Sequence, residues 1–212
     1  MAKVSSYLVL LFICVLCIIG TVEPAKQRGR HSQQARPYIE ASCKGTRYPN
    51  LCIQCLSGFA NSFTIQNPEE LAKVALSISL YRAHHTRWFL LKAAKQLQAV
   101  KAREYPAVSD GLKQIDDSVF QLSQSIRELR RMNESAVSDE VFWHISNVET
   151  WTSAALTDAS TCLDEFPTGR NMSKMKATIK GKVLNVAQVT SNALALFHRY
   201  AAKYKAAAAT RP

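Results

Sequence analysis

The fold is decided by residues 149–166, which read ETWTSAALTDASTCLDEF. Together with the ten residues before them, they place small or apolar side chains at helical spacing. These positions are Val141, Ile145, Val148, Thr152, Ala155, Ala159 and Cys162. Ser153, Ala154, Ala155 and Ala159 would let a neighbouring backbone come close, while the opposite face is polar but short. The pattern fits a tightly packed bundle helix, and it also fits a flat contact surface for another protein.

Two further helices flank this one and are predicted by the same spacing. After Pro106, apolar residues alternate at intervals of four and three, which is typical of a bundle seam. They are Val108, Leu112, Ile115, Val119, Leu122, Ile126 and Leu129. Ser138 can cap the helix of the opening stretch, and Pro167-Thr168-Gly169 would end it. Ser173 can cap the last helix, whose face would carry Met175, Ile179, Val183, Val186, Ala193, Phe197 and Tyr200.

The first long helix begins at Asn67-Pro68-Glu69-Glu70, with Asn as cap, Pro at the first helical position and Glu able to reach back to the cap. Its helical period is carried by Leu71, Val74, Ile78, Tyr81, His85, Trp88, Lys92 and Leu97. Since the next Pro is Pro106, we expect a helix of about 35 residues, roughly 50 Å long. His84 and His85 point about 100° apart on such a helix, which disfavours a shared metal ion.

These segments predict an all-α fold, an up-down-up-down four-helix bundle over residues 67–204. Short loops force neighbouring helices to run antiparallel. Residues 38–66 would add an N-terminal helical hairpin, and residues 205–212 a tail. The sequence has no strand pattern, glycine-rich phosphate loop or internal repeat that competes with this fold.

The N-terminal region predicts an extracellular protein. Residues 1–25 have a basic start, an apolar run from Tyr7 to Gly20 and small residues before Ala25, as a secretory signal peptide does. Residues 26–37 read as a basic flexible arm, either a solvated linker or a segment drawn to a polyanion such as de-esterified pectin. The chain carries a formal charge of +11. In the secretory pathway, Asn133 and Asn171 would be glycosylation acceptors.

Three segments carry a family resemblance. Residues 150–157 (TWTSAALT) followed by 161–166 (TCLDEF), the stretch from Ser42-Cys43 to Cys52, and Val189 to Leu196 occur in matching order and spacing. Across about residues 38–204 the chain resembles the plant invertase and pectin methylesterase inhibitor family. The resemblance implies a disulfide between Cys43 and Cys52 that closes the N-terminal hairpin in an oxidising compartment.

The chain departs from the family pattern at Gly111. The family has a cysteine here, bridged to the cysteine that matches Cys162. Without it, Cys162 is either a free buried thiol or the partner of Cys55. Four mature cysteines allow three pairings, and the sequence does not choose among them. We favour a Cys43–Cys52 bridge with Cys55 and Cys162 free, because Cys55 belongs to the hairpin, away from the middle of the bundle.

The resemblance also implies a target. Its members form a complex of about one to one with pectin methylesterase (pectinesterase) and cover the enzyme's substrate cleft. For this chain it points to the exposed sides of the second and third bundle helices. The predicted partner-binding residues are Lys113, Asp117, Gln121, Gln124, Glu149, Thr150, Thr157 and Asp158.

Two alternatives stay open. Inhibition of acid invertase is the first, although the Pro-Lys-Phe tripeptide of that branch is absent, the corresponding residues being Asp139 to Trp143. A helical module that binds wall polysaccharide or a receptor without inhibiting an enzyme is the second. Any contact of His84, His85 or His144 with a partner would make binding pH-dependent.

Enzymatic chemistry is not predicted. Di-iron bundles use paired Glu-x-x-His motifs, whereas Glu140 and His144 are four residues apart and stand alone. We therefore expect no catalytic residues, no metal ligands, no cofactor and no enzyme activity. The basic residues are not interleaved with aromatic residues on one face, so nucleic acid is not an expected partner. Nor is a membrane, because the mature chain has no second hydrophobic stretch.

Overall fold

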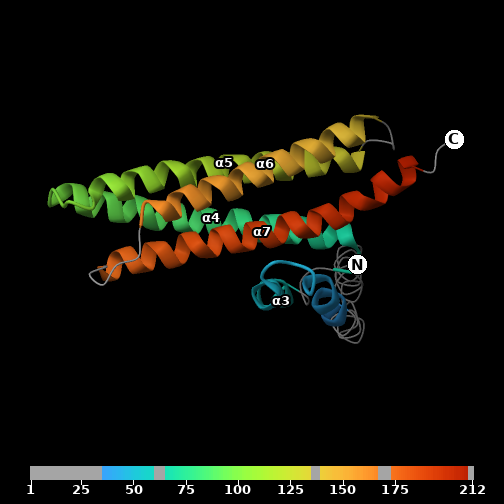
Figure 1. Ribbon diagram of the computed structural model, residues 1–212, viewed down its shortest axis with the longest axis horizontal. Helices are drawn as coiled ribbons and strands as arrows, with labels where there is room; N and C mark the ends of the chain where they lie inside the picture. The colour runs from blue at the N-terminus through green and yellow to red at the C-terminus, as the bar shows by residue number, and fades with distance from the viewer. Residues whose placement is uncertain (1–34, 60–64, 135–138, 167–172, 210–212) are drawn as a thin grey trace, which may run out of the picture.

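Four long helices lie side by side and form the body of the molecule (Figure 1). The computed structural model of the chain describes residues 35–59, 65–134, 139–166 and 173–209. The bundle helices are α4 (Pro68–Ala99), α5 (Tyr105–Glu134), α6 (Asp139–Asp164) and α7 (Lys174–Ala209). Helices α4 and α6 each pack against both α5 and α7. This is the predicted up-down-up-down arrangement, with sequential neighbours in contact.

Helix α4 begins as its sequence predicts. Asn67 Oδ1 accepts a hydrogen bond from the Glu70 backbone N–H at 2.9 Å, and Pro68 occupies the first turn. The Glu70 carboxylate accepts from the N–H of Gln66 at 3.0 Å, one residue before the expected cap. Side chains therefore satisfy donors on both sides of the cap residue.

The helix ends before the predicted break at Pro106. Lys101 adopts a left-handed conformation with φ of 49°. Its N–H donates to Gln98 O at 3.1 Å, and the Ala102 N–H donates to Leu97 O at 2.9 Å. These two bonds define a Schellman motif, which satisfies carbonyls at the helix end. Helix α4 thus has 32 residues rather than about 35.

The buried faces of α5, α6 and α7 follow the predicted spacing. All seven expected positions of α6, from Val141 to Cys162, are buried. On α5 every second member of the expected row is buried and the others are half-buried; the buried ones are Val108, Ile115, Leu122 and Leu129. On α7 only Met175 of the expected face is half-buried rather than buried. Side chains from the four helices and the hairpin form one continuous core.

Helix α4 buries a different row from the one that reveals its period. Beyond Ile78, the residues Tyr81, His85, Trp88 and Lys92 are on the solvent side of the helix, and the two aromatic rings are well exposed. The core is instead reached by smaller side chains, including Ala72, Leu76, Ser79, Ala83, Thr86, Leu90 and Ala93. Aromatic residues at helical spacing therefore mark the outside of this helix, not its packed side.

The N-terminal hairpin consists of a helical stretch at residues 35–43 and helix α3 (Pro49–Ser57). Cys43 and Cys52 form the expected disulfide, with Cα atoms 5.7 Å apart, while Cys55 and Cys162 are free. Ala35 is buried and Arg36 pairs with Glu40 at 3.2 Å. The folded part therefore already includes residues 35–37, which the sequence had suggested to be part of a flexible arm.

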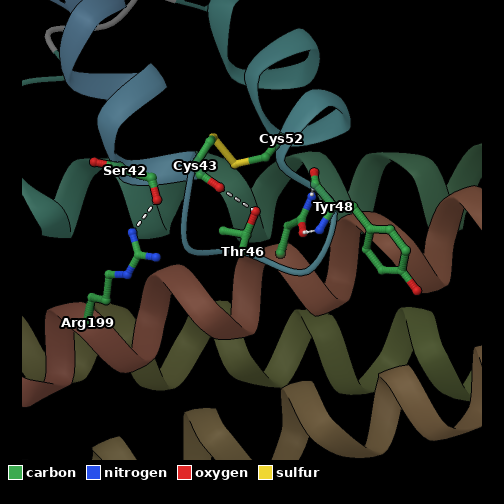
Figure 2. The surroundings of a disulfide bond; sticks show 7 residues. Ser42, Cys43, Thr46, Tyr48, Cys52 and Arg199 are labelled. Atoms are coloured by element: carbon green, nitrogen blue, oxygen red, sulfur yellow. Dashed lines mark hydrogen bonds between the residues drawn. A yellow bond between two sulfur atoms is a disulfide. The ribbon is translucent and has the colours of Figure 1, made fainter.

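The hairpin is held on α7 by polar contacts to its loop (Figure 2). Asn192 accepts from the Tyr48 N–H at 3.0 Å and donates to Tyr48 O at 2.9 Å. Arg199 donates to Ser42 O, and Thr46 Oγ1 closes the loop on Cys43 O at 2.8 Å. A single buried Asn thus satisfies both backbone groups of one loop residue.

Several sequence predictions lie outside the described residues. These are the signal peptide at residues 1–25, the arm up to residue 34, the Ser138 cap, the Pro167-Thr168-Gly169 stop and the sequon at Asn171. The Ser173 cap is present, since its hydroxyl accepts from the Lys176 N–H at 3.3 Å. Asn133 lies in the last turn of α5, where a loop was expected. In the described parts, no helix has the length and apolarity to cross a membrane.

Candidate protein-binding face on α5 and α6

Seven of the eight predicted partner-binding residues flank the outer side of the α5–α6 seam. Helix α5 contributes Lys113, Asp117, Gln121 and Gln124, and helix α6 contributes Thr150, Thr157 and Asp158. Lys113, Asp117, Thr150 and Thr157 are exposed, and the other three are half-buried in the seam. We call this surface the α5–α6 face.

Glu149 does not belong to this face. Its Oε1 lies 3.3 Å from Lys205 Nζ and 3.7 Å from His198 Nε2, both on α7. Successive residues on a helix point about 100° apart, so Thr150 faces outward while Glu149 turns toward α7. The residue pattern alone did not distinguish the two flanks of α6.

The centre of the face holds an acidic cluster. Burial raises the pKa of Asp158, the charge of Asp117 raises it further, and a hydrogen bond with Gln121 acts in the opposite direction. Asp158 Oδ2 and Gln121 Oε1 are buried, and neither accepts a hydrogen bond within the described part of the chain. Leaving these two acceptors unsatisfied costs free energy, and rotation of either side chain toward a partner's donor would relieve that cost.

Between Thr157 and Thr161, the exposed side of α6 carries only short side chains. The hydroxyls of Thr157, Ser160 and Thr161 each donate to the carbonyl four residues earlier, at 2.9 to 3.1 Å. With their hydroxyls turned onto the helix, these residues present short, mostly apolar surfaces to solvent. A partner could approach such a helix closely without first displacing long side chains.

Aromatic residues lie on the same side of the bundle, and the sequence interpretation did not include them among the candidate contact residues. Phe120 of α5 is 55% exposed and meets Trp151 of α6 edge-on, with ring centroids 6.1 Å apart. Trp143 of α6 is 66% exposed. Large aromatic side chains are enriched among the residues that contribute most to protein interfaces. The signal available in the sequence was their position outside the buried rows of α5 and α6.

Small residues bring α5 and α6 together, as the sequence predicted. Ser118 Oγ donates to Ala155 O at 3.0 Å, and Thr152 Oγ1 donates to Ser125 Oγ at 3.0 Å. A hydroxyl reaches a backbone carbonyl of the next helix only where the two backbones are close. The neighbour that Ala155 admits is therefore α5 of the same chain.

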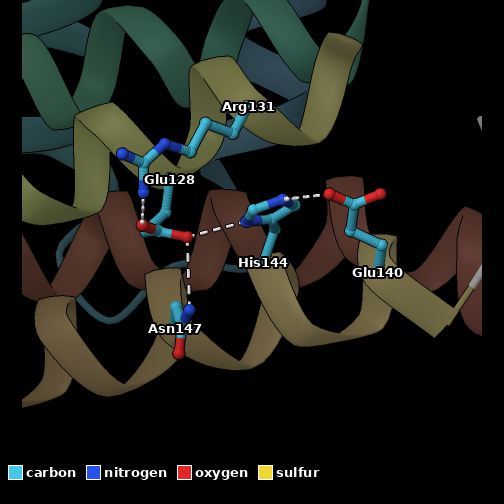
Figure 3. A network of polar contacts seen from close by, with 5 residues as sticks. All are labelled: Glu128, Arg131, Glu140, His144 and Asn147. Carbon is cyan, nitrogen blue, oxygen red and sulfur yellow. Dashed lines mark hydrogen bonds and ion pairs between the residues drawn. The ribbon is translucent and has the colours of Figure 1, made fainter. Parts of the chain in front are cut away.

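A buried polar network joins the same two helices nearer the α5 C-terminus (Figure 3). Glu128 accepts from His144 Nδ1 at 2.7 Å, Asn147 Nδ2 at 3.2 Å and Arg131 at 2.8 Å. Burial alone would raise the pKa of Glu128, but these hydrogen bonds and nearby charges outweigh it and hold the pKa below its ordinary value. Glu140 lies 3.8 Å from His144 Nε2. His144 is thus a buried structural residue, and it is not positioned to touch a partner.

At Gly111, helix α5 packs directly against Cys162, without the cysteine that the family resemblance implies at position 111. A Cβ atom placed on Gly111 would lie 2.9 Å from Cys162 Sγ and 3.2 Å from the ring of Phe166. Cys162 is fully buried, and burial, with the charge of Glu165, raises the pKa of its thiol to about 12. Cys162 is therefore an unreactive thiol directly opposite a glycine.

Comparison with known proteins shows to which family this chain belongs. The profile of the family described as "Plant invertase/pectin methylesterase inhibitor" matches residues 37–196. The chain belongs to this family. It is 40% identical to "Pectinesterase inhibitor 9" from Arabidopsis thaliana, with 91% of this chain and 94% of that protein covered. It is 38% identical to "Pectinesterase inhibitor 11" from the same plant, covering 96% and 100%.

Two further comparisons concern another plant protein and a solved structure. A "21 kDa protein" from Daucus carota is 41% identical, covering 92% of this chain and 96% of that protein. The crystal structure of a mutant form of a pectin methylesterase inhibitor from Arabidopsis superposes with a TM-score of 0.55, covering 76% and 95% of the two chains. At 19% identity, that likeness concerns the fold.

Family membership bears on whether the chain is an enzyme. The matched profile and the pectinesterase inhibitors among its relatives describe inhibitors, which agrees with the expectation that the chain is not an enzyme. Among the residues that the structure describes, no group of three or more His, Cys, Asp and Glu side chains could hold a metal ion. A family member of this kind acts by binding.

Proposed function

We propose that this protein inhibits pectin methylesterase by covering the enzyme's substrate cleft with the α5–α6 face, in a complex of about one to one. The observation that supports the proposal best is the set of side chains that the α5–α6 face presents in a chain of this family. It combines a smooth helix, two exposed aromatic residues and two buried acceptors without donors in the described part of the chain. Interfaces of standard size bury about 800 Å² on each partner, and two adjacent helices can supply such an area.

The mechanism is exclusion of substrate. Phe120, Trp143 and Trp151 would supply apolar contact area, while Asp158 and Gln121 would rotate outward to accept hydrogen bonds from the enzyme. Since the binding energy would come from desolvated contacts at the centre of the face, Lys113 at its edge should contribute little to affinity. Glu149 is not part of this proposal, because it pairs with α7.

The test is inhibition of purified plant pectin methylesterase and acid invertase, side by side, at about pH 5.5 and 7. We expect loss of esterase activity and unchanged invertase activity. The combined variant Thr150→Ala, Thr157→Ala, Asp158→Ala should weaken inhibition at least tenfold. Thr178→Ala is the matched control, because Thr178 is exposed on α7 and its hydroxyl donates to Lys174 O at 2.9 Å, as Thr157 does to Ser153 O.

The outcomes separate the alternatives. If the triple variant inhibited as well as the wild type, the α5–α6 face would not be the contact surface. Loss of invertase activity alone would mean that the invertase is the target. Inhibition of neither enzyme by folded protein would leave the family resemblance as a statement about the fold.

We also propose that the mature protein is secreted to the cell wall and that residues 1–25 are removed on the way. Asn133 and Asn171 would then meet the glycosylation machinery. N-terminal sequencing and deglycosylation of the protein recovered from the apoplast would test both statements. A mature protein that retains residue 1 would contradict the first.

A further inference from the structure

The outward side of α4 carries two solvent-exposed aromatic rings. Tyr81 is 64% exposed and Trp88 is 60% exposed. They are seven residues apart, so they lie on one side of the helix and about 10 Å apart along its axis. His85 lies between them and contacts the Tyr81 ring, with centroids 6.5 Å apart. Two solvent-exposed aromatic rings aligned on one side of a helix form the kind of exposed apolar surface that marks a binding site.

The apolar surface continues past Tyr81 into a hollow beside the hairpin. This hollow has a volume of about 580 Å³ and lies between α4 and the end of α3. Its lining includes Cys55 and Phe59 from the hairpin side and Val74 and Ile78 from α4. Tyr81 lines the hollow as well. The exposed row therefore starts in this hollow at Tyr81 and continues along the open surface of α4 to Trp88.

Positive charge surrounds this row, and the one carboxylate beside it among the described residues is Glu70 at the far end of the hollow. Basic and aromatic residues therefore do share one face of α4, contrary to the expectation from the sequence. From Leu71 to Arg103 the chain has no Asp or Glu but seven Lys and Arg residues. Lys92 Nζ lies 5.6 Å from the Trp88 ring. Neither Lys92 nor its neighbours Arg82 and Lys95 forms an ion pair within the described residues. Their charges are available to a ligand.

The adjacent helix extends the same field. Helix α7 has seven Lys and Arg residues and no Asp or Glu. Its Lys182 reaches α4, where Nζ lies 5.0 Å from the Phe89 ring. Helix α6, which packs on α5 and α7, has five Asp and Glu residues and no Lys or Arg. The bundle is thus basic along α4 and α7 and acidic along α6.

We infer that the outward side of α4 binds an anionic polysaccharide, a polymer of uronic acid. The apolar C–H faces of sugar rings would stack on Tyr81 and Trp88, and the carboxylates would approach Arg82, Lys92 and Lys95. The identity of the polymer rests on the proposed function, because hydrolysis of pectin methyl esters converts neutral uronate esters into carboxylates. This surface is distinct from the basic segment at residues 26–37.

The position of the surface allows two partners at once. Helices α4 and α6 lie diagonally across the bundle, each packed between α5 and α7 (Figure 1). A polymer on the outward side of α4 would leave the α5–α6 face open to an enzyme. Binding to the enzyme's own product would raise the local concentration of the inhibitor where the enzyme works.

The experiment measures the affinity of the folded full-length mature protein for fully de-esterified oligogalacturonate of about ten residues, by calorimetry at low and at moderate salt. The double variant Tyr81→Ala/Trp88→Ala should bind at least tenfold more weakly. Its matched control is Trp143→Ala, which removes an equally exposed Trp from the acidic helix α6 and should leave the affinity unchanged. All three side chains are exposed, so the variants should fold, and circular dichroism checks that they do.

A second pair of variants tests the charges. Lys92→Gln should reduce both the affinity and its salt dependence, whereas Lys113→Gln, whose Lys pairs with Asp110 on α5 at 3.0 Å, should change neither. A methyl-esterified oligomer of the same length should bind at least tenfold more weakly than the acid. Equal affinity of the aromatic double variant and the wild type would overturn the inference. So would equally strong binding of a DNA oligonucleotide or of anionic lipid vesicles.

Gel filtration with purified pectin methylesterase separates this inference from the proposed function. Tyr81→Ala/Trp88→Ala should still form the enzyme complex, and Thr150→Ala/Thr157→Ala/Asp158→Ala should still bind the polymer. A wild-type chain that binds the enzyme but no oligogalacturonate would disprove the inference alone. A chain that binds oligogalacturonate but no enzyme would support the surface on α4 and disprove the proposed function.

Discussion

At the scale of single residues, Gly111 keeps the geometry of the cross-link that the family resemblance implies, although glycine cannot form it. In a disulfide, the Cβ of one cysteine lies roughly 3 Å from the Sγ of the other, given an S–S bond of about 2.04 Å. The 2.9 Å between a Cβ on Gly111 and Cys162 Sγ meets this requirement. Without such a bond, Gly lets the two helices approach, because any Cβ here would crowd Cys162 Sγ and the Phe166 ring.

Gly111→Cys should therefore form a disulfide with Cys162 without moving the backbone. We expect the oxidised variant to exceed its own reduced form by about 2–4 kcal/mol in free energy of unfolding. Urea unfolding with and without reductant measures this. Gly111→Ser, which adds a similar side chain that cannot form a bridge, should show no such dependence on reductant. If the introduced thiol stayed free in the folded, oxidised variant, the two helices would be farther apart than described.

Asp158 predicts a pH dependence of stability. Its pKa is raised in the folded state, mainly by burial, so the folded protein holds this proton more tightly than the unfolded chain does. Stability should therefore fall as pH rises from the ordinary Asp value of about 3.9 to the raised value, and the penalty is complete above it. Asp158→Asn should remove the penalty, raising Tm at pH 7 and leaving it unchanged near pH 3. Parallel melting profiles of the two proteins would contradict this account.

The sequence predicted on which side of the bundle most of the candidate residues lie, while their contact with a partner stays a prediction. Thr150, Thr157 and Asp158 could be placed on the outer side of α6 because the buried row from Val141 to Cys162 fixes the opposite side. Glu149 was misplaced because its direction depends on where Lys205 lies, which local spacing does not reveal. Phe120 was left out because its residue type does not distinguish an exposed aromatic from a buried one, and its position outside the buried row of α5 was not used.

At the scale of helices, α4 shows that the spacing of large side chains can predict a helix without predicting which side of it is buried. Its aromatic row and its buried row are both helical, and the sequence was read by the larger side chains. Packing chose the smaller ones, such as Ala72, Ala83 and Ala93, because α5 and α7 both press against this helix. Hydrophobic size therefore indicated that the segment is helical without indicating which side of it is buried.

The end of α4 offers a test of backbone strain. Lys101 holds a left-handed conformation that costs an L-residue about 1 kcal/mol and costs Gly little. Lys101→Gly should stabilise the protein by about that amount, measured as a higher urea midpoint with an unchanged slope. Lys95→Gly is the control with the opposite sign, because Lys95 is exposed within the helix and Gly there should cost about 1 kcal/mol. If both variants were destabilised, the end of the helix would not have the described conformation.

Glu128 tests the network between α5 and α6. Glu128→Gln keeps the shape but removes the charge that holds His144, Asn147 and Arg131. We expect a loss of about 1–3 kcal/mol at pH 7, visible as a lower Tm. Because the folded pKa is lowered, the stabilisation is complete above the ordinary Glu value of about 4.3 and is lost as pH falls through the lowered value. The difference in Tm should therefore shrink in acid.

The matched control for this variant is Glu140→Gln. Glu140 is exposed and its carboxylate lies 3.8 Å from His144 Nε2, so its removal should cost less than ~0.5 kcal/mol. Similar losses for the two variants would mean that the buried network contributes no more than a surface ion pair.

At the scale of the whole molecule, the bundle could be predicted from the sequence because helical spacing, caps and short connections are all local features of the chain. The α4–α5 connection, residues 100–104, is too short for anything but an antiparallel neighbour. The segregation of charge between α6 and α7 did not follow from the total of +11, because a sum carries no direction. The charge of each segment reveals it, and the structure adds the order of the helices, which puts the basic helices α4 and α7 next to each other.

The contact of the hairpin with α7 has a consequence for biosynthesis. Tyr48 and its partner Asn192 are 144 residues apart in sequence. A ribosome that adds about 5–20 residues per second would therefore expose the hairpin several seconds before its docking site exists. The Cys43–Cys52 bridge has a sequence separation of only 9 and can close during that interval. Ribosome-bound chains that stop before Lys174 should contain this disulfide yet be cleaved by protease in the hairpin, whereas chains that include α7 should resist. The last helix to be made would thus be the one that fixes the first folded segment in place.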